Sequence, residues 1–177
     1  EALIWANTGA IELNGKIFAS QVTKSGLSLL NIRGDQTQFA GNWVIQDGGI
    51  QFLTPDAVGN GSNQIILGGG FMNDNDNYLQ SFYSDVRFNF NPGTPDLFTW
   101  QTGVITSYDI GRVIVTGQGN DRLIQIAGID LRTTNTVAGA GQEGLLTFQV
   151  DSSRVTARTG TVTPDVGRVI REVNLGL

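Results

Sequence analysis

Apolar and polar residues alternate in short segments along most of this 177-residue chain. The clearest alternation is in residues 84–90, where Val86, Phe88 and Phe90 are separated by single polar residues. Successive side chains of a β-strand point to opposite faces of the sheet. The pattern therefore predicts a half-buried strand with three large apolar side chains on its inner face.

Similar segments recur along the whole chain, separated by turn-forming pairs such as Asn14-Gly15 and Pro92-Gly93. No long window has the apolar stripe of an amphipathic helix. The segments predicted as strands are 10–13, 16–19, 27–32, 42–45, 50–53, 64–67, 84–90, 97–105, 112–115, 123–129, 145–150, 154–157, 161–163 and 169–173.

This spacing predicts an all-β fold, because strands that recur every eight to twelve residues or so are typical of antiparallel β-sandwiches and barrels. We expect an antiparallel β-sandwich or jelly roll that forms one domain over residues 1–177, with 1–70 and 71–177 as sub-lobes. The glycine-punctuated first 70 residues leave an alternative, a β-solenoid-like N-terminal part, although no strict period emerges there.

Composition limits the catalytic and metal-binding chemistry that is open to the chain, since it has no histidine and no cysteine. Glycine accounts for 24 residues. The chain lacks the commonest general base, the commonest metal ligand and the only thiol nucleophile. The 16 acidic residues outnumber the 11 basic ones, which gives a net charge of −5. We therefore expect neither nucleic-acid binding nor membrane insertion, because no basic cluster and no long apolar run is present.

The densest polar segment contains Asp74 and Asp76 between asparagines, just after three consecutive glycines. Carboxylate and amide oxygens at alternate positions can converge on calcium, a cation that takes about six to eight oxygen ligands. The glycine and distal glutamate of a complete calcium loop are missing. A calcium site on Asp74 and Asp76 and a solvated loop tip are both left open, and no other cofactor is predicted.

The tripeptide Arg33-Gly34-Asp35 spells an integrin-recognition motif. Gly and Asp in this order are also common in ordinary turns. Both interpretations, adhesion and a structural turn, follow from these residues.

Aromatic residues offer a second kind of binding surface, because their faces can stack on sugars. Trp43 and Trp100 lie in strand-like segments, where a core position is expected. Trp5, Tyr78 and Tyr83 are the candidates for a glycan-binding surface.

Without histidine, catalysis is expected to use a pair of carboxylates, as glycoside hydrolases do. The aspartates lie mostly in turns, where they bond the local backbone, and no pair stands out. The sequence has no Gly-x-Ser-x-Gly motif and no phosphate-binding loop. We therefore predict that the protein is not an enzyme.

Residues 85–150 resemble cohesin-type modules, which are β-sandwiches that bind dockerin partners outside the cell. The resemblance is carried by two segments, 86–97, which has the form of a strand followed by a proline corner and a leucine, and 141–150, which has the form Gly, alternating apolar residues, Phe and Val. The proline corner lacks the family's Tyr-Asp-Pro. The resemblance implies an extracellular protein-binding scaffold.

These observations predict a non-catalytic structural or interaction subunit of an extracellular, cell-surface or virion assembly, such as a fibre, adhesin or scaffold. Its expected partner is itself, as a homo-oligomer or filament, or another surface protein. A carbohydrate-binding module, with or without calcium, is the alternative, and a carboxylate-based glycoside hydrolase is a more remote one.

Overall fold

The computed structural model shows an all-β chain with no α-helix in the part it describes. The described residues are 1–68, 71–73, 79–81, 84–90, 97–108, 110–117, 122–132, 145–150, 155–158, 162–164 and 170–173, and side chains are described for 1–68, 84–90, 103–107 and 111–114.

Two large sheets contain most of the strands, and every strand pair within them is parallel. The first sheet has, in spatial order, β1 (Ala2–Trp5), β3 (Gln21–Ser25), β5 (Asn42–Ile45), β7 (Gln64–Leu67), β11 (Leu97–Tyr108), β13 (Arg122–Arg132) and β15 (Val155–Arg158). The second has β2 (Ile11–Leu13), β4 (Leu29–Ile32), β6 (Gly48–Phe52), β10 (Ser84–Phe90), β12 (Ile110–Gly117) and β14 (Leu145–Val150).

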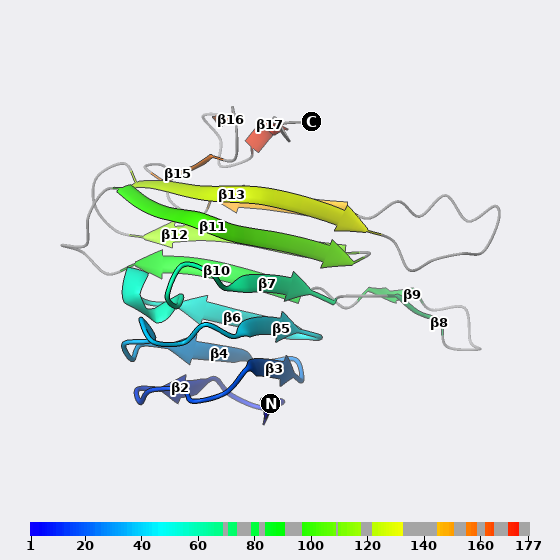
Figure 1. Ribbon diagram of the computed structural model, residues 1–177. Helices are drawn as coiled ribbons and strands as arrows, with labels where there is room; N and C mark the ends of the chain where they lie inside the picture. The colour runs from blue at the N-terminus through cyan, green and yellow to red at the C-terminus, as the bar shows by residue number, and fades with distance from the viewer. Residues whose placement is uncertain are drawn as a thin grey trace.

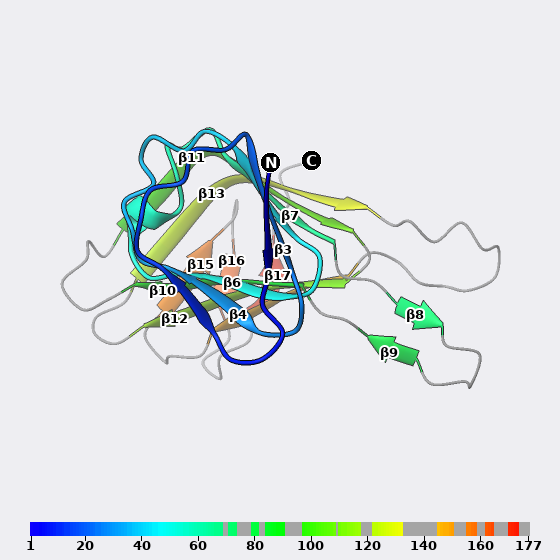
Figure 2. The same cartoon turned by 90° about the horizontal axis from the view of Figure 1, so that it is seen from below.

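The remaining strands form two small antiparallel pairs. One is β8 (Phe71–Asn73) with β9 (Leu79–Ser81), and the other is β16 (Val162–Pro164) with β17 (Ile170–Val173). The β8–β9 pair projects away from the two large sheets in both views (Figures 1 and 2). A short 3-10 helix, η1 (Pro55–Ala57), lies in the connection between β6 and β7.

Consecutive strands in the first part of the chain alternate between the two sheets, so each strand pairs with the strand after next. Ala2 lies beside Val22, Val22 beside Trp43, and Trp43 beside Ile65. One complete turn of the chain therefore takes 20 to 22 residues here. Figure 1 shows these turns stacked from the blue N-terminal strands upward, and Figure 2 shows them superimposed along the stack.

This architecture corrects the prediction of an antiparallel β-sandwich or jelly roll. The turn at Asn14-Gly15 does not join two antiparallel strands, because β2 pairs in parallel with β4 and residues 16–19, which were predicted as a strand, do not form one. Short connections are compatible with parallel pairing because they cross from one sheet to the other. The stacked parallel turns have the geometry of a β-solenoid.

The core lies between the two sheets and is built from inward-facing residues at matching positions in successive turns. Trp43 is fully buried, as expected, and its ring lies 4.7 Å from that of Phe39 and 5.3 Å from that of Phe52, centroid to centroid. Phe52 and Phe88 continue the aromatic series at 5.9 Å. Burial of such large apolar side chains is the main favourable contribution to folding.

The alternation predicted for β10 is confirmed for its apolar face, since Val86, Phe88 and Phe90 are all buried. Asp85 departs from it, because its side chain is also buried although it lies on the other face. It accepts two hydrogen bonds from the Arg112 guanidinium, both at 2.7 Å, and one from Arg87 at 2.9 Å. This pairing compensates for the cost of removing the carboxylate from water.

Candidate functional site

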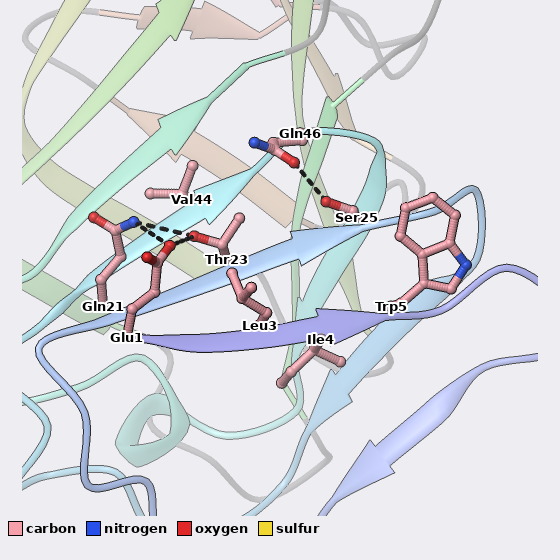
Figure 3. A pocket seen from close by; sticks show the side chains of 9 residues that line it. All are labelled: Glu1, Leu3, Ile4, Trp5, Gln21, Thr23, Ser25, Val44 and Gln46. Carbon is pink, nitrogen blue, oxygen red and sulfur yellow. Dashed lines mark hydrogen bonds between the residues drawn. The ribbon is translucent and has the colours of Figure 1, made fainter.

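A groove of about 430 Å³ lies on the outer face of the first sheet, at its N-terminal edge (Figure 3). Strands β1, β3 and β5 form it together. The outward-facing side chains that line it are Glu1, Leu3, Trp5, Gln21, Thr23, Ser25, Val44 and Gln46. We refer to it as the edge groove.

The parallel register explains why these side chains meet. Leu3 lies beside Thr23, and Thr23 lies beside Val44. Trp5 lies beside Ser25 in the same way. Because side chains repeat every two residues along a strand, these outer positions form short rows that cross the three strands.

One end of the edge groove is a polar network around the Glu1 carboxylate. The Thr23 hydroxyl donates to it at 2.7 Å and the Gln21 amide at 3.0 Å, and the same amide also donates to Thr23. The hydrogen bond from Thr23, followed by that from Gln21, holds the pKa of Glu1 below its ordinary value. The Glu1 side chain therefore presents an ionised carboxylate at this end of the groove at neutral pH.

The opposite end of the edge groove presents an aromatic ring. The side chain of Trp5 is 69% exposed although tryptophan is usually well buried. Next to it, the Ser25 hydroxyl donates to the Gln46 side-chain oxygen. In Figure 3 the indole stands beside Ser25, and the Gln46 amide nitrogen points away from this hydrogen bond.

The backbone of β1 adds an edge to this region with which no other described strand pairs. The Ala6 N–H donates to the Ser25 carbonyl and the Ala6 carbonyl accepts from the Ser28 N–H, both at 2.9 Å. Successive residues of a strand direct their peptide groups to opposite edges. The N–H and C=O groups of Leu3 and Trp5 therefore point away from β3, to the side where the sheet ends at β1.

Both large sheets end at the same end of the stack, because β1 and β2 belong to the same first turn. Exposed apolar side chains gather in and around this turn. Leu3 is 76% exposed and Phe18 is 87% exposed, while Ile11 and Leu27 are also exposed. The first turn thus combines free backbone groups with uncovered apolar surface.

The aromatic candidates from the sequence have different outcomes. Trp5 lies in the edge groove, and Trp43 lies in the core. The side chain of Trp100, like Tyr78 and Tyr83, lies outside the described residues, as do Asp74 and Asp76. Within the described part of the chain, no three residues of the metal-binding types gather into a cluster.

The residues of Arg33-Gly34-Asp35 are all engaged in local structure. The Arg33 guanidinium donates to Glu12 at 3.0 Å, and the Asp35 carboxylate accepts from the Thr37 N–H and hydroxyl and lies 3.6 Å from the Lys16 ammonium. Gly34 is buried against the Asn14 backbone. The tripeptide forms a corner between turns of the stack.

The sequence reasoning missed Glu1, Gln21 and Gln46 as members of a site. They are ordinary polar residues, 20 positions apart from Glu1 to Gln21 and 25 from Gln21 to Gln46, and only the parallel register brings them together. A fixed repeat would have revealed the alignment, but the turn length changes from one turn to the next.

Comparison with protein-family models, with curated proteins and with solved structures found no match. The resemblance to cohesin-type modules therefore stays a prediction. In the described residues, no helix has the length and apolar character needed to cross a membrane.

Proposed function

We propose that this chain is a non-catalytic structural subunit of an extracellular, cell-surface or virion assembly, and that it self-associates through the first turn of its solenoid. The observation that carries the proposal is the outer edge of β1, with which no described strand pairs and beside which Leu3 and Trp5 are exposed. Such edges readily add another strand unless they are blocked by charge, proline or a covering segment.

A second copy fits this edge better than a single extended peptide does. Among the described strands, β1 is outermost in one sheet and β2 in the other, so a partner must supply two strands at once to pair with both. The turn of a second solenoid has this form. At the far ends of the same sheets, β15 and β14 contact the β16–β17 pair, whereas no described strand pairs with the outer edges of β1 and β2.

Composition supports the non-catalytic part of the proposal. Without histidine or cysteine the chain would depend on carboxylates, serine or lysine for acid–base or nucleophilic chemistry. The extracellular or surface location rests on the strand-rich, glycine- and asparagine-rich composition.

The experiment that tests self-association is sedimentation of the parent chain and a Leu3→Pro variant over a wide range of protein concentration. Proline removes the Leu3 N–H, which points to the free edge, and leaves the β1–β3 hydrogen bonds in place. We expect the parent to form higher-mass species as concentration rises and the variant to remain a monomer.

Leu3→Ala is the matched control, because it removes the apolar side chain but keeps the N–H. It is expected to associate more weakly than the parent and more strongly than Leu3→Pro. A parent chain that stays monomeric at every concentration, or a proline variant that associates like the parent, would overturn the proposal.

A further inference from the structure

We propose that the edge groove binds a neutral oligosaccharide, with Trp5 as the stacking platform and the side chains of Gln21, Gln46 and Glu1 as hydrogen-bonding partners. This inference goes beyond self-association, because it assigns a ligand to the outer face of the sheet and not to its edge.

The exposed indole is the first reason. Trp5 keeps more than two thirds of its surface in contact with water in a chain whose Trp43 is fully buried. Pyranose rings have faces of C–H groups that lose unfavourable contact with water when they pack on an aromatic ring. Leu3 extends this apolar surface toward the middle of the groove.

The polar lining is the second reason. Side-chain amides donate and accept hydrogen bonds at the same time, which is what a sugar hydroxyl requires. The Gln46 oxygen already accepts from Ser25, so the orientation of the amide is fixed and its nitrogen is available as a donor. At the other end, Thr23 and Gln21 fix the Glu1 carboxylate, an acceptor for hydroxyl donors.

Charge selects the class of sugar. Among the described residues that line the edge groove, Glu1 alone has a charged side chain. The nearest lysine on β3, Lys24, is fully buried and occupies an inner position of the strand. The Glu1 carboxylate would therefore repel an anionic sugar group placed beside it, whereas a neutral sugar would meet no such repulsion.

Size agrees with a short oligosaccharide. Glu1 and Trp5 are four residues apart on one strand, which corresponds to about 13 Å at the rise of a β-strand. The volume of about 430 Å³ is enough for two to three sugar rings or so. The ligand would lie along β1, with one ring on the indole and the last near the carboxylate.

The experiment is a titration of the full chain, at a concentration where it is monomeric, with cellotetraose, maltotetraose and chitotetraose. Binding is followed by calorimetry and by the NMR signal of the Trp5 indole N–H. We expect at least one of these neutral probes to bind saturably and to shift the Trp5 signal. Trp5→Ala should weaken that binding by about tenfold or more, because the stacking surface is lost.

Trp5→Tyr and Phe18→Ala are the matched controls. Tyrosine keeps an aromatic face and should restore much of the binding, whereas Phe18 is exposed outside the edge groove and its removal should change nothing. Circular dichroism verifies that each variant is folded. Three results would overturn the proposal: no saturable binding of any probe, unchanged binding by Trp5→Ala, or tighter binding of chondroitin sulfate than of the neutral probes.

Discussion

At the scale of single residues, Lys24 is the most unusual position in the described core. Its side chain is fully buried, between the inner positions held by Ile4 and Ile45 in the neighbouring strands. The ammonium donates to the Gly26 carbonyl and, at 2.8 Å, to the Asp47 carbonyl. It thereby satisfies backbone groups at two consecutive corners of the stack.

Burial lowers the pKa of Lys24 from its ordinary value of 10.5, an effect that Asp47 and Asp85 oppose. A lysine with a lowered pKa in the folded state binds its proton more weakly there than in the unfolded chain. Folding therefore releases protons in the window between the folded pKa and 10.5, and this contribution makes the protein more stable as pH rises through that window.

Lys24→Met tests this coupling, since methionine keeps the length of the side chain and removes the titrating group. We expect the free energy of unfolding of the parent, minus that of the variant, to increase with pH up to about 10.4. Urea unfolding at a series of alkaline pH values measures it. Lys16→Met is the control, because Lys16 is exposed and, among the described residues, forms an ion pair with Asp35 alone, at 3.6 Å. A difference that is constant with pH would contradict the assignment.

At the scale of elements, the corners between the two sheets decide where each strand starts. Gly26 lies just after β3 with φ of 84°, a left-handed conformation that L side chains rarely adopt. A Cβ atom at this position would lie 2.5 Å from the Ala6 carbonyl oxygen of the previous turn. The corner is therefore restricted both by its own backbone and by the turn stacked against it.

We predict that Gly26→Ala lowers the free energy of unfolding by about 1–3 kcal/mol from backbone strain, with the close contact adding to this. Gly15→Ala is the matched control, because a Cβ there would meet no atom within 4 Å and no positive φ is required. Its effect should stay within about 0.5 kcal/mol. Urea unfolding monitored by tryptophan fluorescence measures both, and equal effects of the two substitutions would contradict the account.

Some of the strands could be predicted from the sequence and others could not. Residues 42–45, 64–67, 84–90 and 145–150 were predicted as strands and are strands, because alternation with a period of two is a local property. Strand β1 was missed, since its apolar residues Leu3, Ile4 and Trp5 are consecutive and do not alternate with polar ones. The element type is thus largely readable from neighbouring residues.

At the scale of the whole molecule, local alternation does not show which strands pair with each other, or whether they pair in parallel. Alternation is the same in parallel and antiparallel sheets, and short connections favour hairpins unless successive strands lie in different sheets. The repeat that would have revealed the stack changes from 20 to 21 to 22 residues between Ala2 and Ile65. Of the edge groove, only Trp5 was named in advance, because its other residues meet through this register.

Stacked turns also imply that stability is not uniform along the molecule. The turn of β5 and β6 has a neighbouring turn on each side, whereas the turn of β1 and β2 has one neighbour. In a solenoid, each turn is stabilised mainly by its nearest neighbours. The first turn should therefore open most easily of the first three.

Amide hydrogen exchange measures this gradient and links it to self-association. In dilute solution, we expect the N–H groups of Ile4 and Leu13 to exchange faster than those of Ile45 and Phe52, because local opening of an end turn breaks contacts on one side alone. The N–H groups of Leu3 and Trp5 point to the free edge and should exchange fastest within β1.

Measuring hydrogen exchange at higher protein concentration shows whether the outer edge of β1 stays exposed or is covered by a second copy. If copies pair at β1, the Leu3 and Trp5 amides become protected as higher-mass species form, since their N–H groups then donate to the incoming strand. The Ile45 amide, already bonded inside the sheet, should change little. The opposite outcome is a rise in sedimenting mass with no change in the exchange protection of the Leu3 and Trp5 amides. That result would place the contact between copies elsewhere on the molecule.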